Sequence, residues 1–115
     1  MATSAQIRQT AAENLGIRGE GETMPSYEVA DFDQAITEVY GMLRQLNLVT
    51  WASTAAIPDE YAHSFSMMVA SARALKYQIP EERYKRIQYE ADKAIVRIRL
   101  LQTKQKLGQT QIENF

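Results

Sequence analysis

Residues 80–107 read PEERYKRIQYEADKAIVRIRLLQTKQKL, and this stretch decides the fold. Its apolar side chains recur at alternating steps of three and four residues, and they are Tyr84, Ile87, Ala91, Ala94, Ile98 and Leu101. This spacing places a single apolar seam along one side of a helix. A helix of these 28 residues would span about 42 Å. We therefore expect a C-terminal helix that is longer than the elements it packs against.

Two helices are predicted in the first half of the chain. The first opens with Thr3 and Gln6 at the spacing of a capping box, and it stops at Gly16. The second begins with Ser26 as its N-cap and has Glu28 near its N-terminus, where a negative charge is favourable. Its expected core face consists of Val29, Phe32, Ile36, Val39, Tyr40, Leu43 and Leu46. Residues 17–25, rich in glycine and charge, form a connector.

The third helix is predicted to begin with Pro58 as its first residue. Its expected core face consists of Tyr61, Phe65, Met68, Val69, Ala72 and Leu75. A row of small side chains would let another helix approach closely, and it consists of Ala62, Ser66, Ala70 and Ala74. Residues 48–51, just upstream, could form a very short strand or an extended turn.

These patterns predict an all-α fold, a small helical bundle of about four helices. The bundle would have a long C-terminal helix and would occupy residues 1–107. Residues 108–115, GQTQIENF, would form an extended C-terminal arm.

Composition excludes several classes of protein. The chain has 115 residues, 45% of them hydrophobic and 23% charged, which is typical of one soluble globular domain. No apolar run reaches the roughly 20 residues of a spanning helix, so no membrane partner is expected. The absence of cysteine excludes disulfides, thiolate chemistry and Cys-ligated zinc.

The net charge of −1 hides a strong asymmetry along the chain. Residues 1–71 contain three Lys or Arg against nine Asp or Glu, a net charge of −6. Residues 72–115 contain ten against five, a net charge of +5. Copies of such a chain could associate head to tail, with the basic half of one meeting the acidic half of the next. The basic half could also bind nucleic acid, or the charges could simply be solvated.

Catalysis finds little support in the sequence. The single histidine, His63, follows Glu60 at the spacing that puts two metal ligands on one helix face, but a di-iron site needs a second histidine. The chain has no phosphate-binding Gly-x-x-x-x-Gly-Lys loop. We expect no catalytic residue, no metal and no cofactor. A metal-dependent bundle enzyme is the least favoured alternative.

Nucleic-acid binding is the main alternative function. Eight basic residues lie in the helix at residues 83–106, and they are Arg83, Lys85, Arg86, Lys93, Arg97, Arg99, Lys104 and Lys106. A stripe of this kind could contact phosphates, as in a small helical regulatory protein. Against this, four acidic residues are interleaved, namely Glu81, Glu82, Glu90 and Asp92, and the pI is about 5.8.

The order of these segments resembles a known family, the head-to-tail adaptor proteins of tailed bacteriophages. The residues that carry the resemblance are Leu15-Gly16-Ile17, the connector, Ser26, Ala35-Ile36, Met42-Leu43, the turn LNLVTW at 46–51, Ile57-Pro58, Ala70 to Tyr77 and the long last helix. It covers residues 4–102. The chain departs from the family at Gln78, where a glycine often follows the tyrosine, and in its short tail.

The resemblance implies a non-enzymatic virion protein of the head–tail junction, made in the bacterial host cytoplasm. Such adaptors are helical bundles that form a homo-oligomeric ring, commonly of twelve copies, between the portal protein and the tail or stopper proteins. Genomic DNA passes through the channel without sequence-specific reading. Portal docking is accordingly assigned to Lys104, Lys106, Leu107, Gln109, Ile112 and Phe115. Ring contacts are expected on the second and fourth helices, with Glu38, Arg86, Lys93 and Arg97 as candidates.

Overall fold

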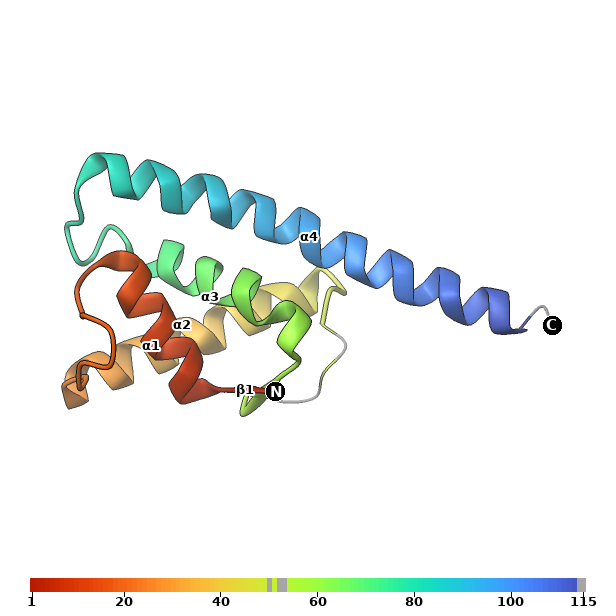
Figure 1. The fold of residues 1–115 in the computed structure, drawn as a ribbon, viewed down its shortest axis with the longest axis horizontal. Helices are drawn as coiled ribbons and strands as arrows, with labels where there is room; N and C mark the ends of the chain where they lie inside the picture. Colours follow the sequence, from red (N-terminus) through yellow and green to blue (C-terminus); the bar gives the residue numbers. More distant parts are fainter. Residues whose placement is uncertain (50, 52–53, 114–115) are drawn as a thin grey trace.

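Helices build almost the whole fold (Figure 1). The computed structural model describes residues 1–49, 51 and 54–113, and their side chains as far as Lys104. Within these residues the helices are α1 (Ser4–Leu15), α2 (Ser26–Gln45), α3 (Asp59–Arg73) and α4 (Glu81–Glu113). The prediction of a small all-α bundle with a long last helix is confirmed.

A short pair of strands joins two distant parts of the chain. β1 (Ala2–Thr3) and β2 (Ala56–Ile57) pair antiparallel, with Ala2 opposite Ile57 and Thr3 opposite Ala56. The strand considered at residues 48–51 is not formed in the described part of that stretch. A two-residue strand is too short to show an alternating pattern, so the sequence gives no signal for this pairing. The pair holds the start of α1 beside the start of α3.

The ends of α1 are as predicted. Thr3 and Gln6 form the reciprocal capping box, in which the Gln6 amide nitrogen donates to the Thr3 hydroxyl at 3.2 Å and the Thr3 amide nitrogen donates to Gln6 Oε1 at 2.8 Å. Gly16 ends the helix in the left-handed region, with φ of 77°. The Arg83 guanidinium of α4 lies over this glycine, in the space that a side chain there would fill.

The starts of α2 and α3 differ from the predictions by one residue. Pro25, rather than Ser26, is the N-cap of α2, and no side chain caps that helix. Pro58 is likewise the N-cap of α3 rather than its first residue. Acidic side chains follow each proline in the first turn, where the helix dipole favours them.

The centre of the bundle is α3, which packs against each of the other three helices and most extensively against α4. Tyr61 and Phe65 of α3 and Phe32 of α2 are the largest fully buried side chains. The row of small side chains is buried from Ser66 to Ala74, in agreement with the close approach expected there. The α4 seam is confirmed too, since its central members are buried and Tyr84 and Leu101 at its ends are half-buried; the central members are Ile87, Ala91, Ala94 and Ile98.

Two predicted core faces are too long at their C-terminal ends. Ala72 lies in the last turn of α3 and is exposed. Because α3 ends at Arg73, Leu75 lies in the α3–α4 connector, where it is 77% exposed. Leu46, after the end of α2, is exposed as well. The opposite error concerns Glu28, which was expected outside the core face but is only 4% exposed.

The last helix extends further than predicted. The backbone stays helical from Glu81 through Gly108 to Glu113, over 33 residues, so the arm expected at residues 108–115 begins as a continuation of α4. One glycine costs a helix only about 1 kcal/mol, which is not enough to end it. Figure 1 shows the C-terminal part of α4 projecting beyond the other three helices. Among the described residues, no helix combines the length and the apolar character needed to cross a membrane.

Candidate interaction surface on the C-terminal helix

A row of positive charge runs along the outside of α4. Arg86, Lys93, Arg97 and Lys104 follow one another at steps of seven, four and seven residues, which are about two, one and two helical turns. All four side chains are exposed. We call them the basic row. It contains three of the four predicted ring-contact residues and one of the six predicted portal-docking residues, Lys104, so Lys104 shares a face with those three.

An apolar row lies beside the basic row. It consists of Tyr89, Val96 and Leu100, which are 57%, 56% and 59% exposed and follow one another at steps of seven and four residues. The Lys93 ammonium lies 4.3 Å from the centroid of the Tyr89 ring, so the two rows are in contact. Apolar side chains repeated along one helix face, outside the buried seam, are typical of a surface that binds another protein.

Among the described side chains, most cations of the basic row form no ion pair with a carboxylate of the same chain. Within the described side chains, Arg86, Lys93 and Lys104 have no ion pair, and Arg97 reaches Glu90 at only 3.5 Å. The acidic half of the chain differs, because most of its carboxylates pair with cations of the same chain, namely Glu22, Glu28, Asp31, Asp33, Glu38 and Asp59. The unbalanced charge of the described part of the molecule is therefore concentrated on α4.

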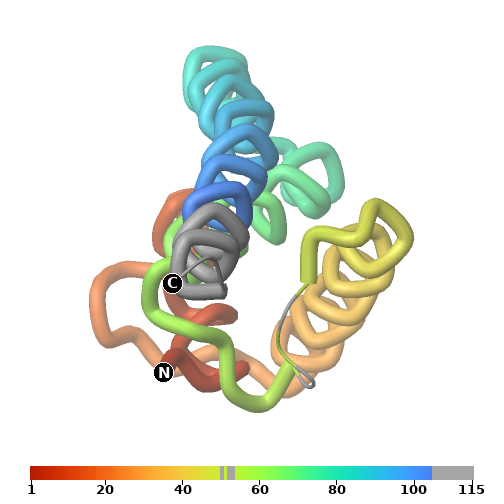
Figure 2. The backbone as a smooth tube through the Cα atoms, turned by 90° about the vertical axis from the view of Figure 1, so that its right-hand side faces the viewer, coloured from red at the N-terminus to blue at the C-terminus, as the bar shows by residue number. Residues whose placement is uncertain are grey.

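A groove lies between α2 and α4, over α3. Figure 2 shows α2 and α4 apart from one another, and each packs on α3. The groove has a volume of about 340 Å³, and we call it the central groove. Its apolar lining includes Val39, Met42, Met68, Ala72, Ala91 and Ile95. Glu38 of α2 and Asp92 of α4 also line it, so the groove is acidic as well as apolar.

Glu38 is the fourth predicted ring-contact residue, and the structure separates it from the other three. It lies in the central groove, where its carboxylate is 3.3 Å from Nη1 of Arg73. Arg86, Lys93 and Arg97 lie on the outside of α4. The predicted ring-contact residues thus fall on two different surfaces of one molecule.

A second groove lies near the point where α4 leaves the bundle. Its volume is about 470 Å³, and we call it the end groove. Arg97, Leu100 and Lys104 line it from α4, opposite Glu60 and His63 of α3. Glu60 and His63 therefore do share a helix face, but no group of three or more His, Asp or Glu side chains among the described residues could hold a metal.

Of the predicted portal-docking residues, only Lys104 has a described side chain. Lys106, Leu107, Gln109 and Ile112 belong to α4 by their backbone, and their side chains lie outside the described part of the structure. Phe115 lies outside the described residues altogether.

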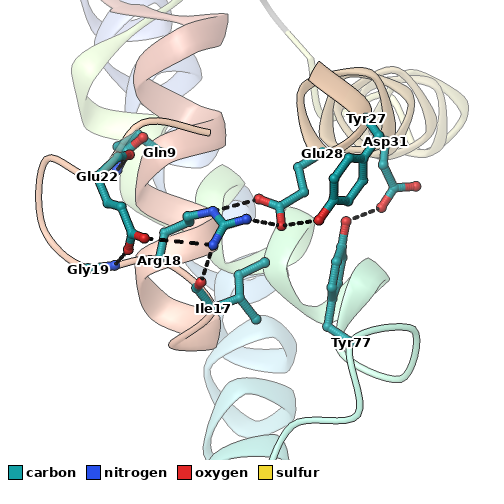
Figure 3. Close-up of polar contacts among 9 residues, drawn as sticks. All are labelled: Gln9, Ile17, Arg18, Gly19, Glu22, Tyr27, Glu28, Asp31 and Tyr77. Atoms are coloured by element: carbon teal, nitrogen blue, oxygen red, sulfur yellow. Dashed lines mark hydrogen bonds and ion pairs between the residues drawn. The ribbon is translucent and has the colours of Figure 1, made fainter. Parts of the chain in front are cut away.

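A buried polar cluster occupies the end of the bundle away from the projecting part of α4 (Figure 3). Arg18 Nε donates to the Glu28 carboxylate at 2.9 Å, which explains how Glu28 can be buried. The Tyr77 hydroxyl donates to Asp31 Oδ2 at 2.8 Å, and its ring stacks on Phe32 with centroids 5.6 Å apart. The cluster thus attaches the two connectors to α2.

The cluster also shifts the acidity of its members. Burial alone would raise the pKa of Asp31, but hydrogen bonds from Lys76 and Tyr77, with the charge of Arg73, hold that pKa below its usual value. Burial and the hydrogen bond to Asp31 raise the pKa of Tyr77. A neutral phenol facing an ionised carboxylate is a stable donor and acceptor pair. Neither the central groove nor the end groove is lined by these residues, so we interpret the cluster as structural.

The apolar row was missed by sequence reasoning. Its signal was present, because Tyr89, Val96 and Leu100 have the spacing of a helix face just as the seam does. One seam is enough to pack a helix on a bundle, so the buried seam of α4 accounts for its expected core face and gives these side chains no predicted role. The central groove had no comparable signal, since it is lined from three helices.

Comparison of the chain with protein-family models, with curated proteins and with solved structures gave no match.

Proposed function

We propose that this chain is a structural adaptor, which assembles with copies of itself and docks on a larger partner through the C-terminal part of α4. The observation that carries the proposal is the geometry of α4: it projects beyond the bundle and presents the basic and apolar rows along its outer face. A helix longer than its packing partners leaves surface uncovered by its own chain, and an apolar row on that surface favours contact with another chain.

The form of adaptor that we propose is the head-to-tail connector of a tailed bacteriophage. This part rests on the family resemblance of residues 4–102. In this role the copies form a ring, commonly of twelve, that joins the portal to the tail or stopper proteins of the virion. Genomic DNA passes through its channel. The contacts in such a ring join different surfaces of neighbouring copies, and an asymmetric distribution of charge suits contacts of that kind.

Sedimentation of the protein with the portal protein encoded by the same genome tests this proposal. We expect one large particle with about one copy per portal subunit, as repeated contacts around a ring would hold it together. Removal of residues 108–115 should abolish portal binding and leave the circular dichroism of the bundle unchanged. Full portal binding by the shortened chain would refute the docking assignment.

A second candidate function, nucleic-acid binding, is favoured by one observation, the lack of ion pairs at Arg86, Lys93 and Lys104 among the described side chains. Titration with duplex DNA tests it. Arg86→Glu should weaken binding if phosphates contact the basic row. Lys85→Glu, which makes the same change of charge at an exposed position off the row, is the matched control. Equal effects of the two substitutions would exclude a specific role for the row.

A further inference from the structure

We infer that the apolar row of one copy packs into the central groove of a second copy of this chain. The inference rests on the self-assembly in the proposed function, and it identifies which surfaces meet. Neither the portal nor DNA is needed for this contact.

Shape is the first argument. The row offers side chains that project from one helix, and the groove offers an apolar floor between two helices. Ala72 and Ala91 are small, and the groove that they line together with Val39 and Met68 has a volume of about 340 Å³, which is room for projecting side chains. Insertion of projecting side chains into gaps between the side chains of a facing helix is the usual way in which helices pack.

Charge is the second argument, and it selects a copy of the same chain as the occupant. The basic row accompanies the apolar row along α4, so a helix seated in the groove would bring its cations to the rim. There they would meet Glu38 and Asp92. Asp92 has no ion pair among the described side chains, and Glu38 has one partner, Arg73. The same chain therefore supplies both the cations and the carboxylates of the contact.

The two surfaces adjoin on α4 but share no residue. Gln88, Asp92 and Ile95 form the α4 wall of the groove, whereas Tyr89, Val96 and Leu100 form the row. When the row of one copy occupies the groove of a second copy, the groove of the first copy and the row of the second copy stay free. Such a contact is heterologous, so it can be repeated by further copies.

Disulfide trapping between two singly substituted copies provides the test, because the natural chain contains no cysteine. One copy carries Val96→Cys in the row, and a second copy with a size tag carries Ala72→Cys in the groove. Both positions are exposed, so the substitutions should not disturb the bundle. The matched control replaces Ala72→Cys by Leu75→Cys, which is also exposed but lies outside the groove.

We expect the Val96–Ala72 pair to give about tenfold more mixed disulfide dimer than the control pair, since the bond forms only when the two Cα atoms come within about 7 Å. Lys93→Glu in the row copy should lower this yield, and Asp92→Lys in the groove copy should restore it. Equal yields for the two pairs would overturn the inference. A dimer that can be trapped in the presence of DNA but not after its removal would overturn it as well.

The outcome can be separated from the fate of the proposed function. A trapped dimer together with no binding to the portal would leave the contact in place and remove the phage role. Portal binding without a trapped dimer would support the phage role and refute the contact between the apolar row and the central groove.

Discussion

Asp31 is the residue on which the buried polar cluster depends. It accepts hydrogen bonds from Lys76 and Tyr77, both at 2.8 Å, and lies 3.2 Å from Arg73 Nε. Three segments of the chain thus meet at one carboxylate: α2, the end of α3 and the α3–α4 connector. Asn could replace only part of this, because the amide is neutral and donates from one side.

Asp31→Asn should lower the free energy of unfolding by about 2 kcal/mol at pH 7, the range for hydrogen bonds to a charged group. The pKa of Asp31 is lower in the folded chain than the 3.8 usual for an aspartate carboxyl. The carboxylate therefore stabilises the fold above that value, and its contribution is lost as the pH falls through the folded pKa. Urea unfolding at pH 7 and pH 3 measures this, with the more exposed Asp33→Asn as control. A difference that stays constant with pH would contradict the explanation.

Gly16 and Gly41 should respond oppositely to alanine. At Gly16, φ of 77° disfavours any side chain, and the Arg83 guanidinium occupies the position of a Cβ. Gly16→Ala should therefore destabilise the fold by about 1–2 kcal/mol or more. Gly41 lies inside α2 with no atom within 4 Å of a Cβ placed there, so Gly41→Ala should stabilise by about 0.5–1 kcal/mol. Thermal unfolding gives both values, and changes of the same sign would refute this account.

The helix α4 has two apolar faces with different tasks. Ile98 belongs to the seam and is fully buried, whereas Val96, two residues earlier, belongs to the exposed row. Ile98→Ala should lower the free energy of unfolding by about 2–5 kcal/mol because it leaves a cavity. Val96→Ala should change it by less than about 0.5 kcal/mol. Denaturant titration of dilute protein compares them, and a large loss at Val96 would mean that the row belongs to the core.

Local signals explain what could be predicted from the sequence. The capping box at Thr3, the stop at Gly16 and the seam of α4 each depend on residues within one or two helical turns. The burial of Glu28 could not be predicted, because its partner Arg18 comes from a connector without regular pattern. The same holds for the pairing of β1 with β2 and for the central groove, since both join segments far apart in the chain. The spacing of the four cations in the basic row therefore predicts that they share one face of α4. The separation of this row from Glu38 could not be predicted in the same way.

Salt should distinguish the two candidate partners of the whole molecule. Most carboxylates of the acidic half are paired internally, so the positive charge of α4 dominates its long-range attraction for polyanions. Binding to duplex DNA should therefore weaken steeply as salt rises, through loss of counterion release. The contact between row and groove is largely apolar and should weaken much less. Fluorescence anisotropy with DNA and disulfide trapping, each measured across a salt series, compare the two slopes. A steep loss of trapping with salt would mean that charge alone drives the contact.

The central position of α3 has a mechanical consequence. Because α2 and α4 each rest on α3 and have little contact with one another, either can shift its tilt while keeping its own packing. Packed helices slide past one another by small side-chain adjustments. We therefore expect the molecule to yield most easily across the groove. In the string of copies that we propose, a slight change of tilt in each one would add up to a change of curvature, and α3 would be the pivot that sets how sharply the string bends.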